Sequence, residues 1–353
     1  MPNKLIKKGI RFSKNTSLMN KYQQIVNEII KAKNIVITSH KSPDGDSIGS
    51  SLGLYHFIQK LEKQVVICHQ DQVPAYLNWL DYISSVYTFP NDKSIIEKYI
   101  HDADLIFCLD YNALDRVGED MQILLEKSNC KKIMIDHHLN PQEFAYITVS
   151  ETEVCSTSQL IVELIEQSGN IDLLDEKIGT PLYLGILTDT GSFRFPSVNS
   201  RTHQVLAKLL EAGVQHHLIH ENLNDTNTVG RLRLQGYAMS QKLEILDNYK
   251  VAIIFLTETE HIQYNYQKGD TDGLPNTALS IKGMKAAILL SERDGIIKIS
   301  FRSKGKENPV NILAAEHFEG GGHANAAGGK SELTMTQTLV KLKELIPTYF
   351  FSC

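Results

Sequence analysis

Short apolar runs alternate with amphipathic stretches over the first two thirds of the chain. Four runs have strand character, at residues 34–38, 64–68, 104–110 and 132–136. They are continuously apolar, which is typical of strands covered on both faces of a sheet. Periodic apolar positions predict helices at residues 17–33, 47–61, 156–167, 175–187 and 202–212. The alternation predicts an α/β domain with a mostly parallel sheet flanked by helices.

The helix predicted at residues 47–61 contains an unusual number of small residues. Gly49 and Gly53 stand among Ser47, Ser50 and Ser51 in its first half. Glycine lowers helix propensity, so its repeated use needs a separate reason. We expect this helix to approach the sheet or a ligand closely.

The pattern changes after residue 213. Residues 214–240 are polar and mostly helical in character, with little to bury, and we interpret them as a connector. Hairpin-like strands are predicted at residues 243–246, 251–256, 286–291 and 296–301. A helix at 310–318, a glycine-rich loop at 320–329 and a helix at 336–345 complete a smaller α+β domain. The predicted organisation is a flexible leader (1–17), a first domain (18–213), the connector (214–240) and a second domain (241–347).

The composition excludes several classes of protein. A chain of 353 residues is long enough for two domains, and its net charge of −5 argues against sequence-blind binding to long duplex DNA. Five scattered cysteines without a CxxC pair indicate a reducing compartment, with no disulfide framework and no zinc ribbon. No apolar run approaches the ~18 residues that a membrane helix needs. We therefore expect a cytoplasmic protein without a membrane partner.

The N-terminal stretch is basic. Lys4, Lys7, Lys8, Arg11 and Lys14 precede the first acidic residue, Glu28. Such a stretch can be a transit peptide or a nucleic-acid arm. We favour a solvated leader without either function.

Acidic and imidazole side chains follow four apolar segments, which we interpret as strand ends. They are His40 with Asp44 and Asp46, then Asp110, then Asp136 with His137 and His138, and finally Asp189. Each alone has an ordinary explanation: Asp46 as a helix N-cap, Asp110 as a strand terminator, Asp189 as an Asx turn. Together, five acids and three histidines are enough for two ions that share one carboxylate. Imidazole with carboxylate oxygen suits Mn²⁺, Fe²⁺ or Zn²⁺ better than Ca²⁺.

A second set of candidate residues lies near the C-terminus. Three consecutive glycines, Gly320, Gly321 and Gly322, expose backbone N–H groups that can cradle phosphate oxygens, and His323 adds a titratable donor. The alternative is a flexible hinge. Arg302 lies late in a strand and can fork onto a phosphate, or it is a surface arginine. The histidines at 216, 217 and 220 follow no strand, and we interpret them as surface residues.

In combination these residues resemble the DHH phosphoesterase family, in the subgroup with a DHHA1 C-terminal domain. The resemblance covers about residues 20 to 345, and no motif position departs from it. The matched motifs are His40-x3-Asp44-x-Asp46, Asp110, Asp136-His137-His138, Thr188-Asp189-Thr-Gly and Gly320-Gly-Gly-His323 with Ala326-Ala327-Gly328. The first domain would be the DHH catalytic domain, and the second would be the DHHA1 substrate-binding domain.

The resemblance implies a role for each residue. One Mn²⁺ would be held by His40, Asp44 and Asp110, and a second by Asp46, Asp110, His137 and Asp189. Asp136 would orient the histidines, and His138 would face the scissile phosphate. Arg302 and the segment from Gly320 to His323 would bind the nucleotide.

The layout is most similar to the branch of nanoRNases that are also pAp phosphatases. It implies a Mn²⁺-dependent phosphoesterase acting on short RNA oligonucleotides or adenine nucleotides, and a homodimer is compatible with it. The alternatives are a phosphodiesterase for pApA or cyclic di-AMP and, less favoured, a nucleotide-binding regulator without catalysis.

Overall fold

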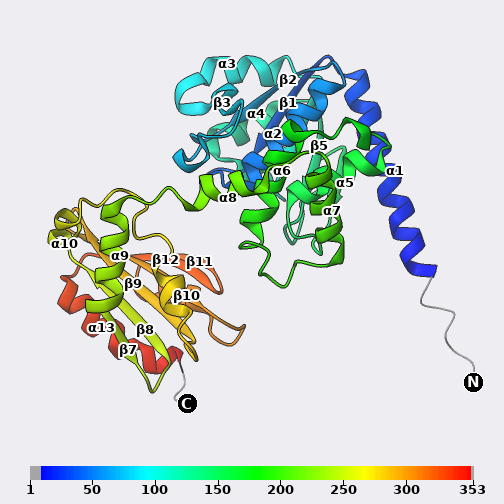
Figure 1. The fold of residues 1–353 in the computed structure, drawn as a ribbon. Helices are drawn as coiled ribbons and strands as arrows, with labels where there is room; N and C mark the ends of the chain where they lie inside the picture. Colours follow the sequence, from blue (N-terminus) through cyan, green and yellow to red (C-terminus); the bar gives the residue numbers. More distant parts are fainter. Residues whose placement is uncertain (1–8, 351–353) are drawn as a thin grey trace, which may run out of the picture. The chain divides into compact units, whose positions relative to one another are not determined.

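The computed structural model describes residues 9–350, which form two compact units with the chain boundary between Thr226 and Asn227 (Figure 1). Within the described residues, no helix is both long and apolar enough to cross a membrane. The connector predicted at 214–240 is divided between the units: helix α8 (His216–Asn224) belongs to the first, and α9 (Val229–Gln241) belongs to the second.

Unit 1 is built on a six-stranded sheet in which every neighbouring pair is parallel. Its strand order is β3-β2-β1-β4-β5-β6. The strands are β1 (Asn34–Ser39), β2 (Gln64–His69), β3 (Val86–Thr88), β4 (Leu105–Leu109), β5 (Lys131–Asp136) and β6 (Ile147–Ser150). The predicted parallel α/β fold is confirmed. The order reverses between β1 and β4, where open sheets of this kind place their ligands at the carboxyl ends of the strands.

Helices cover both faces of this sheet (Figure 1). They are α1 (Gly9–Lys31), α2 (Gly45–Lys60), α3 (Phe89–His101), α4 (Glu119–Lys127), α5 (Thr157–Gln167), α6 (Glu176–Asp189) and α7 (Ser200–Glu211). Alternate strand residues face opposite sides. Ile35 and Ile37 pack with α1, α2, α5 and α6, whereas Val36 packs with α3 and α4.

The N-terminal helix extends further than its pattern predicts. Helix α1 begins at Gly9, so the second half of the predicted leader 1–17 is helical. Residues 1–8 of that leader lie outside the described residues. The apolar stripe that revealed the helix starts at Leu18, and nothing before it has the periodicity of a buried face.

The glycines of α2 make close contact with helix α6. A Cβ placed on Gly45 would lie 2.3 Å from Thr188 Oγ1, and one on Gly49 would lie 2.3 Å from the carbonyl oxygen of Pro181. A Cβ on Gly53 would meet the side chain of Leu182 at 2.4 Å. One face of α2 is therefore small at every turn, so that the two helix backbones can approach each other.

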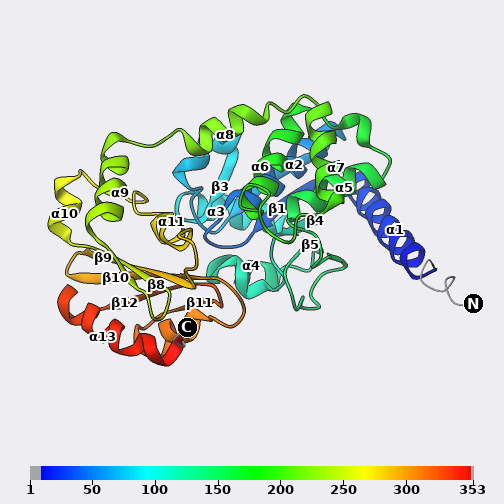
Figure 2. The same ribbon diagram turned by 60° about the horizontal axis from the view of Figure 1, so that its bottom comes forward.

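Unit 2 contains a mixed six-stranded sheet of order β11-β12-β10-β9-β8-β7. Its strands are β7 (Leu243–Leu246), β8 (Val251–Leu256), β9 (Ala286–Arg293), β10 (Ile296–Ser303), β11 (Gly321–His323) and β12 (Ala326–Ser331). Only the β8–β9 pair is parallel within this described sheet. Helices α12 (Val310–His317) and α13 (Met335–Tyr349) pack on one face, and α9 and α11 (Leu274–Leu279) pack on the other (Figure 2). The short α10 (Glu258–Gln263) follows β8.

The segment at 320–329 is a strand pair, where a loop was predicted. Gly321, Gly322 and His323 form β11 and pair with the start of β12. A Cβ on Gly320 would lie 2.1 Å from the carbonyl oxygen of Gly328, so a larger residue would not fit there. The glycines therefore serve close backbone approach, a use that composition does not distinguish from flexibility.

Replacing Gly49 by alanine is expected to destabilise unit 1 by about 1–3 kcal/mol, because the added Cβ meets backbone that cannot rotate away. Gly53→Ala, on the same helix, is expected to cost less, because the Leu182 side chain can shift. Trp79 is the single tryptophan of the chain and lies in unit 1. Its fluorescence during urea unfolding therefore gives the free energy of unfolding of unit 1 in both variants. Equal losses in the two variants would contradict this account of the α2–α6 contact.

Candidate metal centre

The predicted ligands come together at the carboxyl edge of the unit 1 sheet. His40 follows β1, Asp110 follows β4, and Asp136 ends β5 directly before His137. Asp44 and Asp46 stand at the start of α2. Asp189 is the last residue of helix α6, which confirms the helix predicted at residues 175–187. The interpretation of Asp189 as the end of a strand is wrong. The glycine contacts between α2 and α6 bring this helix end to the sheet edge.

The ligand atoms form two groups around the Asp110 carboxylate. In the first group, His40 Nε2 lies 3.3 Å from Asp110 Oδ2 and 3.7 Å from Asp44 Oδ1. In the second, His137 Nε2 lies 3.4 Å from Asp110 Oδ1, 3.2 Å from Asp189 Oδ2 and 3.9 Å from Asp46 Oδ2. Three sets have ligand atoms that all lie within 4.8 Å of one another, and each could hold a metal ion: His40 with Asp44 and Asp110, Asp46 with His137 and Asp189, and Asp110 with His137 and His138. Each oxygen of Asp110 faces a different group.

The loops that carry these ligands contain strained backbone. Ser42, Asp110, Asn140, Ser192 and Phe193 all have φ between 54° and 64°, in the left-handed region. This conformation costs most non-glycine residues roughly 1–2 kcal/mol, whereas Asp and Asn adopt it more readily. The strain at Asp110 is notable because this residue turns directly out of β4.

Asp46 is a fully buried carboxylate at the N-terminus of α5. The backbone N–H of Thr157 donates to its Oδ2 (2.6 Å), and the N–H of Ser158 donates to its Oδ1 (2.9 Å). These donors carry the partial positive charge of a helix start. Sequence reasoning missed them, although three consecutive hydroxyl residues, Ser156 to Ser158, open this helix.

Asp44, not Asp46, caps helix α2. Its Oδ1 accepts hydrogen bonds from the backbone N–H groups of Asp46 (3.1 Å) and Ser47 (3.0 Å). The role of helix N-cap, which was considered for Asp46, therefore belongs to Asp44. Asp46 lies two residues after Asp44, and its side chain points to α5 and His137.

Asp136 orients His138. Its Oδ1 lies 2.7 Å from His138 Nδ1, and its Oδ2 accepts the backbone N–H of the same residue (2.9 Å). Asp136 is fully buried, whereas the His138 side chain is partly exposed. With Nδ1 engaged, Nε2 is the ring nitrogen left for a ligand.

The closely spaced charges shift the pKa values of the histidines and aspartates of the site. Burial would lower the pKa of His40, but the carboxylates of Asp110 and Asp44 raise it to about 11. Asp110, Asp46 and Asp189 likewise overcome burial to raise the pKa of His137 to about 10. Burial and the Asp110 carboxylate raise the pKa of Asp189 to about 7.

The pKa values of two buried carboxylates, Asp46 and Asp110, shift in opposite directions. Burial raises the pKa of Asp46, and the charges of Asp110 and Asp189 add to that rise. For Asp110, hydrogen bonds from His137 and His40 outweigh burial and lower the pKa. A bound cation would relieve the repulsion among these carboxylates.

In unit 2, Arg302 and His323 share one face of the sheet. Arg302 on β10 pairs with Ala326 on β12, which pairs in turn with His323 on β11. Directly paired residues point to the same side, so the guanidinium of Arg302 and the imidazole of His323 flank a small alanine. The N–H of Gly320 donates to the carbonyl of Ala314 (3.1 Å). This N–H is therefore not part of a phosphate cradle, which corrects that prediction for Gly320.

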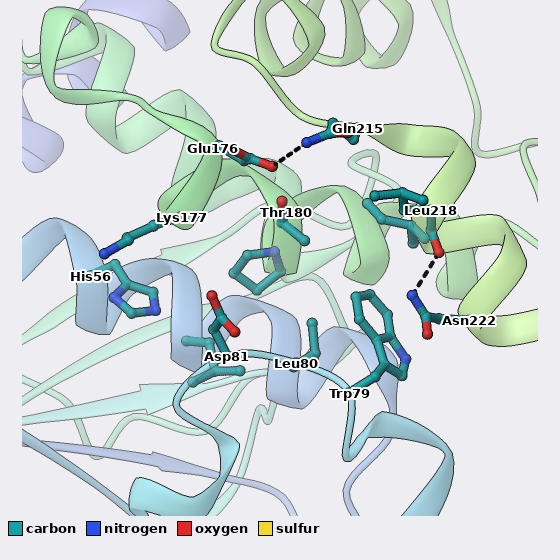
Figure 3. A pocket seen from close by; sticks show the side chains of 13 residues that line it. His56, Trp79, Leu80, Asp81, Glu176, Lys177, Thr180, Gln215, Leu218 and Asn222 are labelled. Carbon is teal, nitrogen blue, oxygen red and sulfur yellow. Dashed lines mark hydrogen bonds between the residues drawn. The ribbon is translucent and has the colours of Figure 1, made fainter.

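The other candidate features of unit 1 lie apart from the ligands. His216 and His217 are exposed and His220 is half-buried on α8, as expected of surface residues. A cavity of about 290 Å³ lies between α2, α6, α8 and the segment around Trp79 (Figure 3). Its lining includes His56 and Lys177 but none of the metal-ligand candidates. These residues lie ten and twelve positions along α2 and α6 from Asp46 and Asp189, about 15–18 Å at the helical rise.

Comparison with known proteins gives consistent matches over both units. The model of the DHH family, N-terminal domain, matches residues 34–186, and that of the DHHA1 domain matches residues 248–346. The bifunctional oligoribonuclease and PAP phosphatase NrnA of Thermus thermophilus is 31% identical over 86% of this chain and 87% of its own length. The cyclic-di-AMP phosphodiesterase GdpP of Geobacillus thermodenitrificans is 27% identical over 91% of this chain but 48% of its own length.

A solved structure resembles the whole chain. The crystal structure of an exopolyphosphatase-related protein from Bacteroides fragilis has a TM-score of 0.88 and 38% sequence identity. The match covers 94% of this chain and 96% of that one.

Divalent cation binding is expected to release protons near neutral pH and to tighten as the pH rises. With pKa values of about 11 and 10, His40 and His137 are protonated at neutral pH, and their ring nitrogens must lose those protons to accept a cation. Calorimetric titration with Mn²⁺ between about pH 6.5 and 8.5, in buffers of different ionisation enthalpy, measures both effects. An affinity independent of pH would contradict the assignment of these imidazoles as ligands.

Proposed function

Because the chain belongs to the DHH family and carries a DHHA1 domain, we propose that it is a Mn²⁺-dependent phosphoesterase that degrades very short oligoribonucleotides to mononucleotides. We propose that it also converts 3′-phosphoadenosine 5′-phosphate (pAp) to AMP. The observation that carries the proposal is the Asp110 carboxylate, whose two oxygens face two separate groups of ligands. Such a shared carboxylate is what a two-metal phosphoesterase site needs.

The donor set fits two divalent ions. His40, Asp44 and Asp110 would hold one, and Asp46, Asp110, His137 and Asp189 would hold the other. Mn²⁺ accepts both imidazole and carboxylate ligands, which supports it over Ca²⁺. When bound, the ions would supply Lewis-acid stabilisation of the phosphoryl charge and lower the pKa of a nucleophilic water.

The remaining residues of unit 1 would position the reacting phosphate. Asp136 holds the His138 ring by Nδ1, and the free Nε2 can donate a hydrogen bond to an oxygen of the scissile phosphate. His138 therefore acts as the electrostatic partner of the phosphoryl group, and Asp136 acts through it.

Arg302, His323 and the glycines of β11 would bind the rest of the nucleotide. A guanidinium and an imidazole on one sheet face suit a phosphate. A Cβ on Gly321 would meet nothing within 4 Å, so this glycine leaves space for a sugar or a base to approach the backbone. The chain has a net charge of −5, so a few such groups fit short substrates better than long duplex DNA. The buried free thiols of Cys68, Cys108 and Cys155 support a cytoplasmic setting.

One alternative has support of its own. The match to the cyclic-di-AMP phosphodiesterase GdpP spans 91% of this chain, so cyclic di-AMP or pApA is the second candidate substrate. The NrnA relative is 31% identical to this chain and the GdpP relative is 27% identical, and the higher identity favours the first proposal. The complete ligand set argues against a regulator without catalysis.

Hydrolysis of pApA, pAp, cyclic di-AMP and a five-nucleotide RNA should be compared in Mn²⁺ and in chelator. The linear substrates and pAp are expected to be consumed in Mn²⁺ alone, because the ligand set supplies no catalysis without a cation. His137→Ala should abolish turnover, and His217→Ala, at an exposed histidine of α8, should not. Opening of cyclic di-AMP at comparable kcat/KM would replace the proposed function with the alternative.

Arg302→Ala is expected to raise KM for dinucleotides by about tenfold or more, because it removes a charge-assisted hydrogen bond worth about 1.5–3 kcal/mol. KM for bis-p-nitrophenyl phosphate, which has no second nucleotide, should change little. Lys298→Ala is the matched control, since Lys298 lies on the same strand, points to the same face and is exposed. Equal effects on both substrates would remove Arg302 from the substrate site.

A further inference from the structure

We propose that Thr157 is a positioning residue that fixes the carboxylates of Asp46 and Asp110. It thereby sets the affinity of both groups of ligands for a divalent cation. The inference rests on the proposed metal-dependent function and adds a residue to it. Thr157 is distinct from the candidate ligands, which are all aspartates and histidines.

One residue bonds to two of the proposed ligands. The backbone N–H of Thr157 donates to Asp46 Oδ2 (2.6 Å), and its hydroxyl donates to Asp110 Oδ1 (3.0 Å). Thr157 and Asp46 are both fully buried, and Asp110 is nearly so. The two bonds connect the carboxylate shared by both groups to one that belongs to the second group.

The Asp110 carboxylate needs such a partner. Asp110 leaves β4 with a φ of 62°, and its backbone N–H donates to the carbonyl of Ile135, which fixes the main chain. The terminal torsion of an aspartate is broad, so a fixed main chain does not fix the plane of the carboxylate. The Thr157 hydroxyl holds Oδ1, and the carboxylate plane then directs Oδ2 toward His40.

The element that carries Thr157 is rigid. Thr157 is the first residue of α5, and the side chain of Ser156 caps this helix by accepting the N–H of Gln159. Leu160, Ile161 and Leu164 bury the same helix in the core of unit 1. A supporting residue on a packed helix holds a ligand more firmly than one on a loop.

The hydroxyl can be removed without disturbing the backbone bond to Asp46. Thr157→Val keeps the shape and loses the hydroxyl, and Thr157→Ser keeps the hydroxyl. Loss of a group that orients a metal ligand typically lowers affinity by about 10- to 100-fold, and we expect Thr157→Val to show this loss. We expect Thr157→Ser to stay close to the wild-type affinity.

The measurement is direct Mn²⁺ binding to the full chain, by calorimetry and by the electron paramagnetic resonance of free Mn²⁺. Thr338→Val is the control for loss of a buried hydroxyl, since Thr338 is fully buried and bonds to Ser331 in unit 2. Its thermal unfolding should change and its Mn²⁺ affinity should not. Thr157→Ala, which adds no bulk beside the carboxylates, is a second variant in case the valine prevents folding.

The outcomes separate this inference from the proposed function. Wild-type Mn²⁺ affinity in folded Thr157→Val or Thr157→Ala would overturn the role of Thr157, whatever the substrate. A weakened affinity that Thr157→Ser restores would support it. If the wild-type chain binds Mn²⁺ but hydrolyses none of the four test substrates, the proposed function fails and the role of Thr157 stands.

Discussion

The Asp110 carboxylate, held between two imidazoles, is the contact on which the rest of unit 1 depends. Its oxygens lie 3.3 Å from His40 and 3.4 Å from His137, and the three residues follow three adjacent strands, β1, β4 and β5. Parallel strands end at one edge, so this meeting needs only that the strands pair in register. The left-handed turn at Asp110 is the local cost of directing its side chain across that edge.

Helices α2 and α6 supply two further acidic ligands, Asp46 and Asp189. Asp46 comes from the first turn of α2 and Asp189 from the last residue of α6, so these antiparallel helices must pack closely for the two acids to meet. Gly45 and Gly49 make that approach possible, since a Cβ on either would lie 2.3 Å from an atom of α6. Gly185 serves the same purpose from α6, because its Cβ would lie 2.7 Å from Asp46 Oδ1. The centre is thus set by backbone packing as much as by its ligands.

Burial gives the site its chemistry. Asp46, Asp110 and Asp136 are almost completely withdrawn from water, and each is compensated by a different partner: helix N–H groups, imidazoles, and His138 with its own backbone. Buried carboxylates that retain unused lone pairs attract cations strongly, because water does not compete for them. His138, in contrast to these carboxylates, is partly exposed and can reach a ligand.

The sequence by itself determined the parallel sheet, the four principal strands and the types of ligand, because continuous apolar runs and the residues that follow them are local properties. It did not reveal β3 and β6, which have three and four residues, or the pairing of Gly321 to His323 with β12. Only the tertiary structure decided that Asp189 lies beside His137, that the α2 glycines face α6, and that Thr157 bonds to Asp46 and Asp110. Those bonds join residues 111 and 47 positions apart. No periodicity records such contacts, because they depend on how whole elements pack and not on the neighbours of a residue along the chain.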